Sequence, residues 1–135
     1  MTATDARPIV IVTAAVIERD GMFLVTRRPE GTHLAGYWEF PGGKCDRGES
    51  LPSCLTREIR EELDAGIDVG GELFSMSHTY PDRVVHLHFF RGELTDEPRP
   101  TLGQEMRWVR REDLQALAFP PADAELITRL GRGDL

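Results

Sequence analysis

The chain has 135 residues, of which 40% are hydrophobic and 29% charged, a composition typical of a globular domain and not of a disordered or fibrous chain. Its 23 acidic residues outnumber its 16 Lys and Arg residues, which gives a formal net charge of −7. This negative charge argues against nucleic-acid binding and against docking on anionic membranes, because both need clustered cations. We therefore expect a single domain over residues 1–135, with neither a nucleic acid nor a membrane as its partner.

The apolar stretches and the cysteines argue against a membrane span and a disulfide scaffold. The longest apolar stretch, residues 9–17, is far shorter than the roughly 20 residues that a membrane span needs. Residues 1–8 lack the charge pattern of a signal peptide. Cys45 and Cys54 form no CxxC motif and no disulfide framework, so we expect two inert thiols in a reduced, cytoplasmic protein.

The first third of the chain predicts two strands followed by a long loop. Residues 9–17 are β-branched and apolar on both faces, which indicates a buried strand. Asp20-Gly21 is a hairpin-turn signal, so residues 22–26 should return as a second strand. Residues 29–48 are rich in Gly and Pro and contain three aromatic residues. A loop of this length inside a small domain is more often functional than idle.

A helix should follow this loop. Ser50 is a suitable N-cap, and Pro52 falls in the first turn, where its missing N–H costs little. Apolar residues recur at every fourth position and form one stripe: Leu51, Leu55, Ile59 and Leu63. The helix should end near residues 64–66, with either Gly66 or Asp64 supplying a left-handed cap.

The second half of the chain predicts three strands and two closing helices. The strands are expected at residues 72–78, 84–91 and 106–109, and the helices at residues 112–117 and 122–130. Strands on both sides of a central helix, with helices at the end, predict an α/β (α+β) fold. Its central mixed β-sheet should be covered on two faces.

Three acidic residues share one face of the predicted central helix. Glu58, Glu61 and Glu62 stand at i, i+3 and i+4 and span an arc of about 100°. Like charges repel, and we expect Arg57 and Arg60 to point elsewhere, so a cation is missing from this face. Mg²⁺ or Mn²⁺ would supply it, because carboxylate oxygens suit hard divalent ions. For a bare ExxEE pattern, a solvated acidic face is the simpler interpretation.

The residues before the helix extend this possible metal site. Glu49 offers a fourth oxygen donor just ahead of the first helical turn. Gly42 and Gly43 have no side chains, so the loop backbone can approach both an ion and phosphate groups. The segment from residue 43 to residue 62 is therefore the most informative part of the sequence about chemistry.

The spacing within this segment resembles the Nudix box, G-x5-E-x7-R-E-U-x-E-E-x-G-U, in which U is a bulky aliphatic residue. The residues that match in register are Gly43, Glu49, Arg57, Glu58, Ile59, Glu61 and Glu62. Six identities at background frequency give a chance match on the order of one in ten million per window. The end of the box departs from the pattern, with Asp64 in place of the glycine and Ala65 in place of the aliphatic residue. We expect a changed helix exit and an unchanged metal site.

The resemblance implies the Nudix fold, an α/β/α sandwich that carries this loop and helix. It implies hydrolysis of a nucleoside diphosphate linked to another group, with Mg²⁺ as cofactor and Mn²⁺ as a possible substitute. The metal-binding residues implied in this way are Glu49, Glu58, Glu61, Glu62 and the backbone of Gly42.

The same resemblance implies the catalytic residues. Glu58 and Glu61 would act with the metal, and Glu58 or a nearby carboxylate would be the general base. Arg57 would orient the acidic side chains by ion pairing. Glu105, in the loop before Met106, would add a ligand or a base from a second segment.

Three further stretches, residues 27–44, 80–83 and 119–123, are similar to the MutT branch of the Nudix family, whose members hydrolyse nucleoside triphosphates. The nucleotide-binding residues implied by this similarity are Arg28, His33, Leu34, Phe40, Gly43, Lys44, Arg83 and Asp123. Several of them also have a purely structural interpretation. Phe40 suits the core equally well, Arg83 suits the start of a surface strand, and Asp123 suits a helix N-terminus.

Asp123 leaves the preferred base open. Members of the branch that recognise 8-oxoguanine can have an asparagine there, which donates and accepts hydrogen bonds, whereas an ionised aspartate only accepts. Ionised Asp123 suits the exocyclic amine of cytosine, and protonated Asp123 suits 8-oxoguanine.

We therefore expect an Mg²⁺-dependent nucleoside triphosphate pyrophosphohydrolase that acts on modified nucleotides such as 8-oxo-dGTP. The first alternative is a cytidine nucleotide pyrophosphohydrolase acting on CTP, dCTP or 5-methyl-dCTP. The others are a hydrolase of ADP-ribose or a dinucleotide, and a non-catalytic nucleotide-binding module. Either a monomer or a homodimer is compatible with the sequence.

Overall fold

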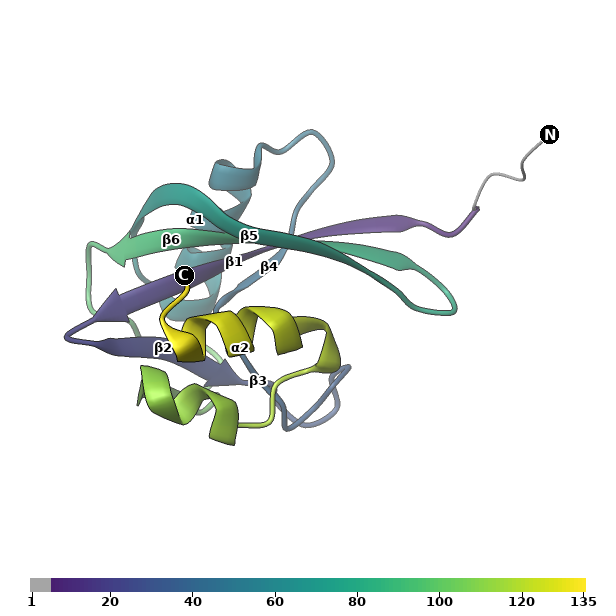
Figure 1. The fold of residues 1–135 in the computed structure, drawn as a ribbon. Helices are drawn as coiled ribbons and strands as arrows, with labels where there is room; N and C mark the ends of the chain where they lie inside the picture. The colour runs from purple at the N-terminus through teal and green to yellow at the C-terminus, as the bar shows by residue number, and fades with distance from the viewer. Residues whose placement is uncertain (1–5) are drawn as a thin grey trace.

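The computed structural model describes residues 6–135, so residues 1–5 of the amino-terminal stretch considered above lie outside the described part. Its strands are β1 (Ile9–Arg19), β2 (Met22–Arg27), β3 (Trp38–Glu39), β4 (Gly42–Lys44), β5 (Ile67–Thr79), β6 (Val84–Leu94) and β7 (Met106–Arg110). They form one sheet in the order β3-β2-β1-β6-β5, with β4 paired to β1 and β7 to β2 (Figure 1). Strands β1 and β6 run parallel, whereas β1 pairs with β2 and β4 antiparallel. The mixed sheet confirms the expected fold class.

Helices cover both faces of the sheet, as predicted. They are α1 (Leu51–Leu63), the 3-10 helices η1 (Arg111–Ala116) and η2 (Pro121–Asp123), and α2 (Ala124–Arg132). In Figure 1 α1 lies behind the sheet and α2 in front of it. Ala15 and Ile17 of β1 pack with the apolar stripe of α1, whereas Ala14 and Val16 pack with α2 and η1. Strand β1 is apolar on both faces because both faces are buried.

The two amino-terminal strands are confirmed, and each is slightly longer than predicted. The turn between them places Asp20 at φ 54° and Gly21 at φ 76°, the left-handed pair that a tight hairpin requires. The predicted long loop, residues 29–48, was wrong in part because it contains β3 and β4. These strands of two and three residues are too short to show an alternating pattern in the sequence.

Helix α1 begins and ends as its sequence indicates. The Ser50 hydroxyl oxygen accepts a hydrogen bond from the Ser53 N–H at 3.2 Å, and Pro52 lies in the first turn. Asp64 forms the cap in the left-handed conformation, with φ 50° and ψ 40°. Asp64 rather than Gly66 therefore supplies the left-handed residue, and the helix exit still forms where the box departs from its pattern.

The remaining elements correct the predictions in length and type. Strands β5 and β6 both run beyond the expected ranges and form the long antiparallel pair that projects from the body in Figure 1. The predicted helix at residues 112–117 is the 3-10 helix η1, and the one at residues 122–130 is η2 followed by α2. None of the helices within residues 6–135 is long and apolar enough to cross a membrane.

Candidate active site

A cavity of about 320 Å³ opens between β1, β4, β6 and the segment that leads into α2. Its size is that of a small-molecule site. All eight residues predicted to bind nucleotide line it: Arg28, His33, Leu34, Phe40, Gly43, Lys44, Arg83 and Asp123. Residues that are far apart in the sequence are thus brought to one site, although only the resemblance, and no local pattern, indicated that they belong together.

The floor of the cavity is aromatic and aliphatic. Phe40 is 3% exposed and packs edge-to-face on Phe89, with the ring centroids 6.3 Å apart. It also lies 5.6 Å from the ring of Phe119. The structural interpretation of Phe40 is therefore confirmed, because the side chain belongs to the core, and the same residue also lines the cavity. Leu34, at the rim, has φ 58°, a conformation that branched residues rarely adopt outside ligand sites and turns.

An ion pair lies on the wall of the cavity. The Arg28 guanidinium donates to the Glu39 carboxylate at 2.9 Å and also to the His33 carbonyl. Burial raises the pKa of Glu39, and the charge of Arg28 and its hydrogen bond offset part of that rise. The predicted set of site residues did not include Glu39. In the sequence, Glu39 is marked only by its position between two aromatic residues, Trp38 and Phe40. Both of these are buried in the structure.

Asp123 lies at the start of α2 but does not cap that helix, because its side chain makes no hydrogen bond to the first turn. The residue is 7% exposed and lines the cavity. Burial, and secondarily the negative charge of Glu39, raise the pKa of Asp123 to about 7. A carboxyl group in this state is both a donor and an acceptor near neutral pH.

The raised pKa of Asp123 predicts a pH-dependent stability. The folded protein holds this proton more tightly than the unfolded chain, so the free energy of unfolding falls as the pH rises from about 4 to 7. An Asp123→Asn variant has no ionisable group at this position, so its free energy of unfolding does not decrease for this reason. Its stability relative to the parent protein should therefore rise over the same interval, by up to about 4 kcal/mol. Urea unfolding at several pH values measures the difference, and Asp113→Asn, at an exposed carboxylate, should show no such trend.

Arg83 presents an unused donor at the opposite side of the cavity. Within residues 6–135 its Nε is the only buried side-chain nitrogen or oxygen atom without a hydrogen-bond partner. The guanidinium lies over the Tyr80 ring, 5.4 Å from its centroid, which fixes its orientation. A buried N–H without a partner favours a ligand that accepts from it. The structure thus supports the functional interpretation of Arg83 over that of a surface charge.

The acidic face of α1 adjoins this cavity, and Arg57 is at its centre. Arg57 donates through Nη1 to Glu58 at 2.9 Å and to Glu61 at 3.1 Å. Through Nε and Nη2 it donates to the two carboxylate oxygens of Glu49, at 2.7 and 2.8 Å. The expectation that Arg57 points away was wrong, because its long side chain reaches both the next residue and the next turn. Arg60 does point away, toward Asp64 and Asp96.

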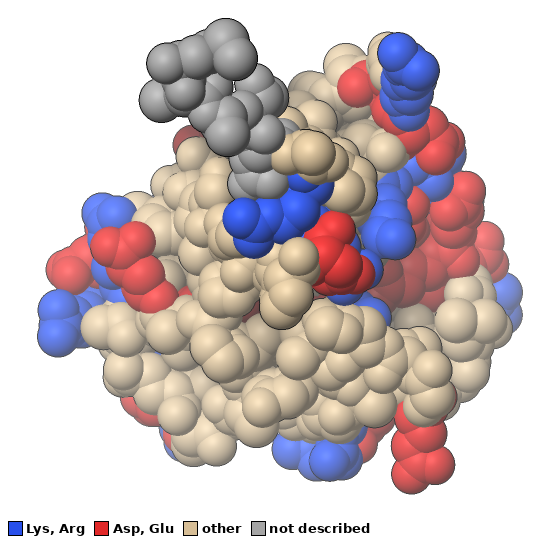
Figure 2. Space-filling view, turned by 90° about the vertical axis from the view of Figure 1, so that its right-hand side faces the viewer, with Lys and Arg blue, Asp and Glu red and all other residues tan. Residues whose placement is uncertain are grey.

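Figure 2 shows the same mixture of charges over a wider area. Acidic side chains gather on the right of this face, where Lys and Arg side chains lie among them, whereas the area just below the centre of the face is largely uncharged. The acidic side chains of α1 are therefore not a uniformly solvated acidic surface. They are oriented by a cation of the protein itself.

Glu62 is held differently from the other acids of α1. One of its carboxylate oxygens accepts from the Thr26 hydroxyl at 3.2 Å, and the other accepts from the Gly42 N–H at 3.3 Å. Burial, and then the charge of Glu39, raise the pKa of Glu62 to about 7. Burial likewise raises the pKa of Glu58, although Arg57 opposes this.

The carboxylates of Glu58 and Glu62 are desolvated, and protein groups neutralise their charge only in part. Carboxylate oxygens of this kind suit a hard divalent cation as ligands. Glu49 fits less well as a direct ligand. Both of its oxygens bind Arg57, one of them also accepts from the Asp46 N–H, and these bonds lower its pKa to about 2. We therefore assign Glu49 the role of holding Arg57, which in turn orients the acidic side chains, and not that of a direct ligand.

Because Gly43 has no side chain, the Glu58 carboxylate can occupy the space next to it. A Cβ at this position would come within 2.2 Å of the Glu58 carboxylate oxygen Oε2. Gly43→Ala should therefore displace Glu58 and lower kcat/KM about 10- to 100-fold, as changes behind metal ligands do. The matched control is Gly71→Ala, because a Cβ there meets nothing within 4 Å. Steady-state kinetics of both variants tests this, and equal kcat/KM values would contradict the assigned role of Gly43.

Glu105 is not joined to the helix acids. Its carboxylate forms ion pairs with Arg27 at 3.4 Å and with Arg107 at 2.7 Å. Its loop does approach α1, since the Thr101 N–H donates to the Glu62 carbonyl at 3.0 Å. The side chain of Glu105 is turned instead toward the two arginines, which lie on the neighbouring strands β2 and β7.

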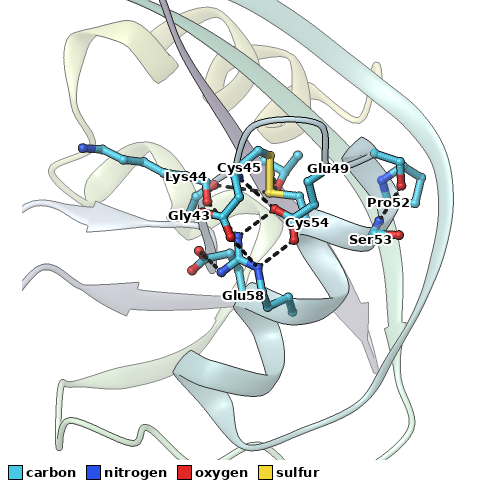
Figure 3. Close-up of a disulfide and its surroundings, with 12 residues drawn as sticks. Gly43, Lys44, Cys45, Glu49, Pro52, Ser53, Cys54 and Glu58 are labelled. Atoms are coloured by element: carbon cyan, nitrogen blue, oxygen red, sulfur yellow. Dashed lines mark hydrogen bonds and ion pairs between the residues drawn. A yellow bond between two sulfur atoms is a disulfide. The ribbon is translucent and has the colours of Figure 1, made fainter.

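Cys45 and Cys54 form a disulfide, which corrects the expectation of inert thiols (Figure 3). Gly48, at φ 81°, turns the loop after β4 so that the first turn of α1 returns to the strand. The two Cα atoms are then 5.2 Å apart, a separation that a disulfide can span. The spacing of the two cysteines in the sequence does not predict that the first turn of α1 comes back to β4.

The chain is similar to proteins of known activity along most of its length. The NUDIX domain family matches residues 12–129. An 8-oxo-dGTP diphosphatase of Haemophilus influenzae is 38% identical over 92% of this chain and 93% of its own length. A CTP pyrophosphohydrolase of Escherichia coli is 37% identical over 86% of this chain and 87% of its own length.

Solved structures agree with these similarities. The solution structure of the E. coli ORF135 protein aligns with a TM-score of 0.83 and 33% identity, covering 94% of this chain and 91% of that one. The crystal structure of the MutT protein from Methanosarcina mazei Go1 aligns with a TM-score of 0.85 and 26% identity, covering 97% and 99%.

Proposed function

The chain belongs to the NUDIX domain family, and from this premise we propose that it hydrolyses nucleoside triphosphates to the monophosphate and pyrophosphate. It is a hydrolase of phosphoric anhydrides, and its relatives include diphosphatases named for 8-oxo-dGTP and for CTP. One observation carries the proposal: the cavity lined by the predicted nucleotide-binding residues and the acidic face of α1 share the backbone of β4.

Strand β4 connects the two halves of the site. Gly42, Gly43 and Lys44 all line the cavity. The Gly42 N–H also holds Glu62, and Gly43 leaves the space for Glu58. A nucleotide whose base lies among Phe40, Arg83 and Asp123 would extend its phosphates along β4 to the acids, where exposed Lys44 adds a cation.

The residues proposed to hold a divalent cation are Glu58, Glu61 and Glu62, with Mg²⁺ as the ion and Mn²⁺ as a substitute. When bound, such an ion neutralises the charge of the phosphates and of the leaving pyrophosphate. Arg57 holds Glu58 and Glu61 in place, while Thr26 and the Gly42 N–H hold Glu62. We assign the general base to Glu58, whose raised pKa suits a carboxylate that accepts a proton from water.

Asp123 is proposed to contact the edge of the base. With a pKa of about 7, both of its protonation states are populated at neutral pH. The protonated form would donate to an oxidised purine such as 8-oxoguanine, and the ionised form would accept from the exocyclic amine of cytosine. We therefore propose 8-oxo-dGTP as the leading substrate and cytidine triphosphates as the second. Two activities of this kind are named separately among the relatives.

The other expectations stay predictions. These are a single domain over residues 1–135, a cytoplasmic location, the absence of a nucleic-acid partner, and a monomer or homodimer. Hydrolysis of ADP-ribose or a dinucleotide, and binding without catalysis, remain the alternatives for the function. The intact acidic set on α1 favours catalysis over mere binding.

A panel of nucleotides tests the proposal. The full chain would be assayed with Mg²⁺ on 8-oxo-dGTP, dGTP, dCTP, 5-methyl-dCTP, CTP and ADP-ribose, and kcat/KM compared. We expect the highest kcat/KM for 8-oxo-dGTP, followed by the cytidine nucleotides. Turnover of ADP-ribose alone would overturn the triphosphate assignment. Nucleotide binding without any turnover would indicate a binding module.

A further inference from the structure

The disulfide lies inside the loop that carries the acidic set. Cys45 directly follows β4, and Cys54 lies in the first part of α1, nine residues later. The loop that they close contains Glu49, whose carboxylate lies within 4.8 Å of both sulfur atoms. Figure 3 shows the disulfide beside Glu49 and above Glu58. The disulfide thus lies next to Glu49, and hydrogen bonds run from Glu49 through Arg57 to Glu58.

The two sulfur atoms differ in their surroundings. Cys54 is fully buried, whereas Cys45 is partly exposed. The buried Thr13 hydroxyl lies 3.2 Å from the Cys54 Sγ and 3.9 Å from the Cys45 Sγ. Cys45 is therefore the more accessible of the two to an attacking thiolate, and a thiolate formed on Cys54 would have the Thr13 hydroxyl as a hydrogen-bond donor. Access and leaving-group stabilisation together favour one direction of exchange.

We propose that Cys45 and Cys54 are a redox-modification site that takes a small dithiol as its reductant and sets the metal affinity of the acidic site. A thiolate of the dithiol attacks the Cys45 Sγ, and the electron pair of the broken S–S bond goes to Cys54, which then takes a proton. The second thiol of the reductant displaces Cys45. The protein gains two electrons and two protons, and the dithiol becomes a disulfide.

Reduction changes the site because two unbonded sulfurs must move apart to van der Waals contact. Cys54 is a buried residue of α1, so we expect the movement to fall on Cys45 and on the loop that contains Glu49. Glu49 then holds Arg57 less firmly, and Arg57 holds Glu58 and Glu61 less firmly. Changes to groups behind metal ligands typically weaken metal affinity 10- to 100-fold, so we expect a loss of about tenfold.

The test compares oxidised and reduced forms of the same full chain, with Mn²⁺ alone as the probe. One sample is oxidised with glutathione disulfide. The other is reduced with dithiothreitol and freed of it without air, and thiols are counted by maleimide labelling after denaturation. Calorimetric titration should give a Kd for Mn²⁺ that is about tenfold higher in the reduced form, and reoxidation should restore it. The reduced form should also melt on the order of 10 °C lower.

Cys45→Ser provides the matched variant, because this position is partly exposed and the change leaves no buried gap. It should show the weaker Mn²⁺ affinity and no response to either reagent. Equal Mn²⁺ affinity in the oxidised and reduced parent chain would overturn the proposal. If the two forms then differed only in melting temperature, the disulfide would be a structural cross-link without an effect on the metal site. Failure of the disulfide to form under glutathione disulfide would also overturn it.

This inference rests on the metal site proposed above, but the Mn²⁺ measurement does not require turnover of a nucleotide. A redox-dependent affinity in a protein that turns over no nucleotide would support this site and refute the proposed activity. Turnover of nucleotides with equal Mn²⁺ affinity in both forms would do the opposite. Where both hold, kcat/KM at limiting Mn²⁺ should fall about tenfold on reduction and recover on reoxidation.

Discussion

The Glu58→Gln variant should lose about three orders of magnitude in kcat and bind the nucleotide with a nearly unchanged Kd. The amide removes one negative oxygen from the acidic set and removes the proposed base. The nucleobase would keep its proposed contacts, because Phe40, Arg83 and Asp123, which line the cavity, are unchanged. A thousandfold loss corresponds to about 4 kcal/mol of transition-state stabilisation, which is the several kcal/mol expected of a metal site.

The matched control for this variant is Glu112→Gln, which changes an exposed carboxylate of η1 in the same way. Its kcat should lie within a factor of two or so of the parent value, as for ordinary surface changes. The assay is release of pyrophosphate at saturating Mg²⁺, with the Kd measured separately. Retention of most of the turnover by Glu58→Gln would show that Glu58 is neither a ligand nor the base.

The Asp123→Asn variant should change the choice between bases and remove its pH dependence. In the parent protein, the ratio of kcat/KM for dCTP to that for 8-oxo-dGTP should rise as the pH increases through about 7. In the proposed role, protonated Asp123 would donate to the purine, whereas ionised Asp123 would accept from the cytosine amine. Asparagine always offers both a donor and an acceptor. The variant should therefore give a flat ratio, changed by about 10- to 100-fold at high pH in favour of the purine.

Competition between the two nucleotides at several pH values measures this ratio in a single mixture. The Asp113→Asn variant serves as the control, because that carboxylate pairs with Arg110 outside the cavity. It should keep the pH dependence of the parent protein. If Asp123→Asn also keeps that dependence, another group contacts the base edge.

The helix that carries the acidic residues was predicted because its signal is local. Glu58, Glu61 and Glu62 lie on one helix as their spacing predicts. Ser50 caps its start as predicted, and Asp64, one of the two predicted candidates, caps its end. The cavity was predicted only through the resemblance, since Arg28, Arg83 and Asp123 meet through the sheet topology. No pattern within a single element encodes that meeting.

The errors arose where side-chain reach or loop geometry decides the outcome. Arg57 was expected to point away from the acidic face, yet its flexible side chain reaches Glu58 and Glu61. The same side chain crosses to Glu49 in the preceding loop. The disulfide depends on a single left-handed residue, Gly48, which returns α1 to β4. Glu39 was missed because the two-residue strand β3 shows no periodicity from which the facing side could be inferred.

The most direct test of the central claim is ³¹P NMR of the products formed from 8-oxo-dGTP with Mg²⁺, with and without a chelator. The account predicts nucleoside monophosphate and pyrophosphate as the products, formed only while the divalent ion is free to bind. Formation of nucleoside diphosphate and orthophosphate, or the same turnover in the presence of chelator, would contradict it.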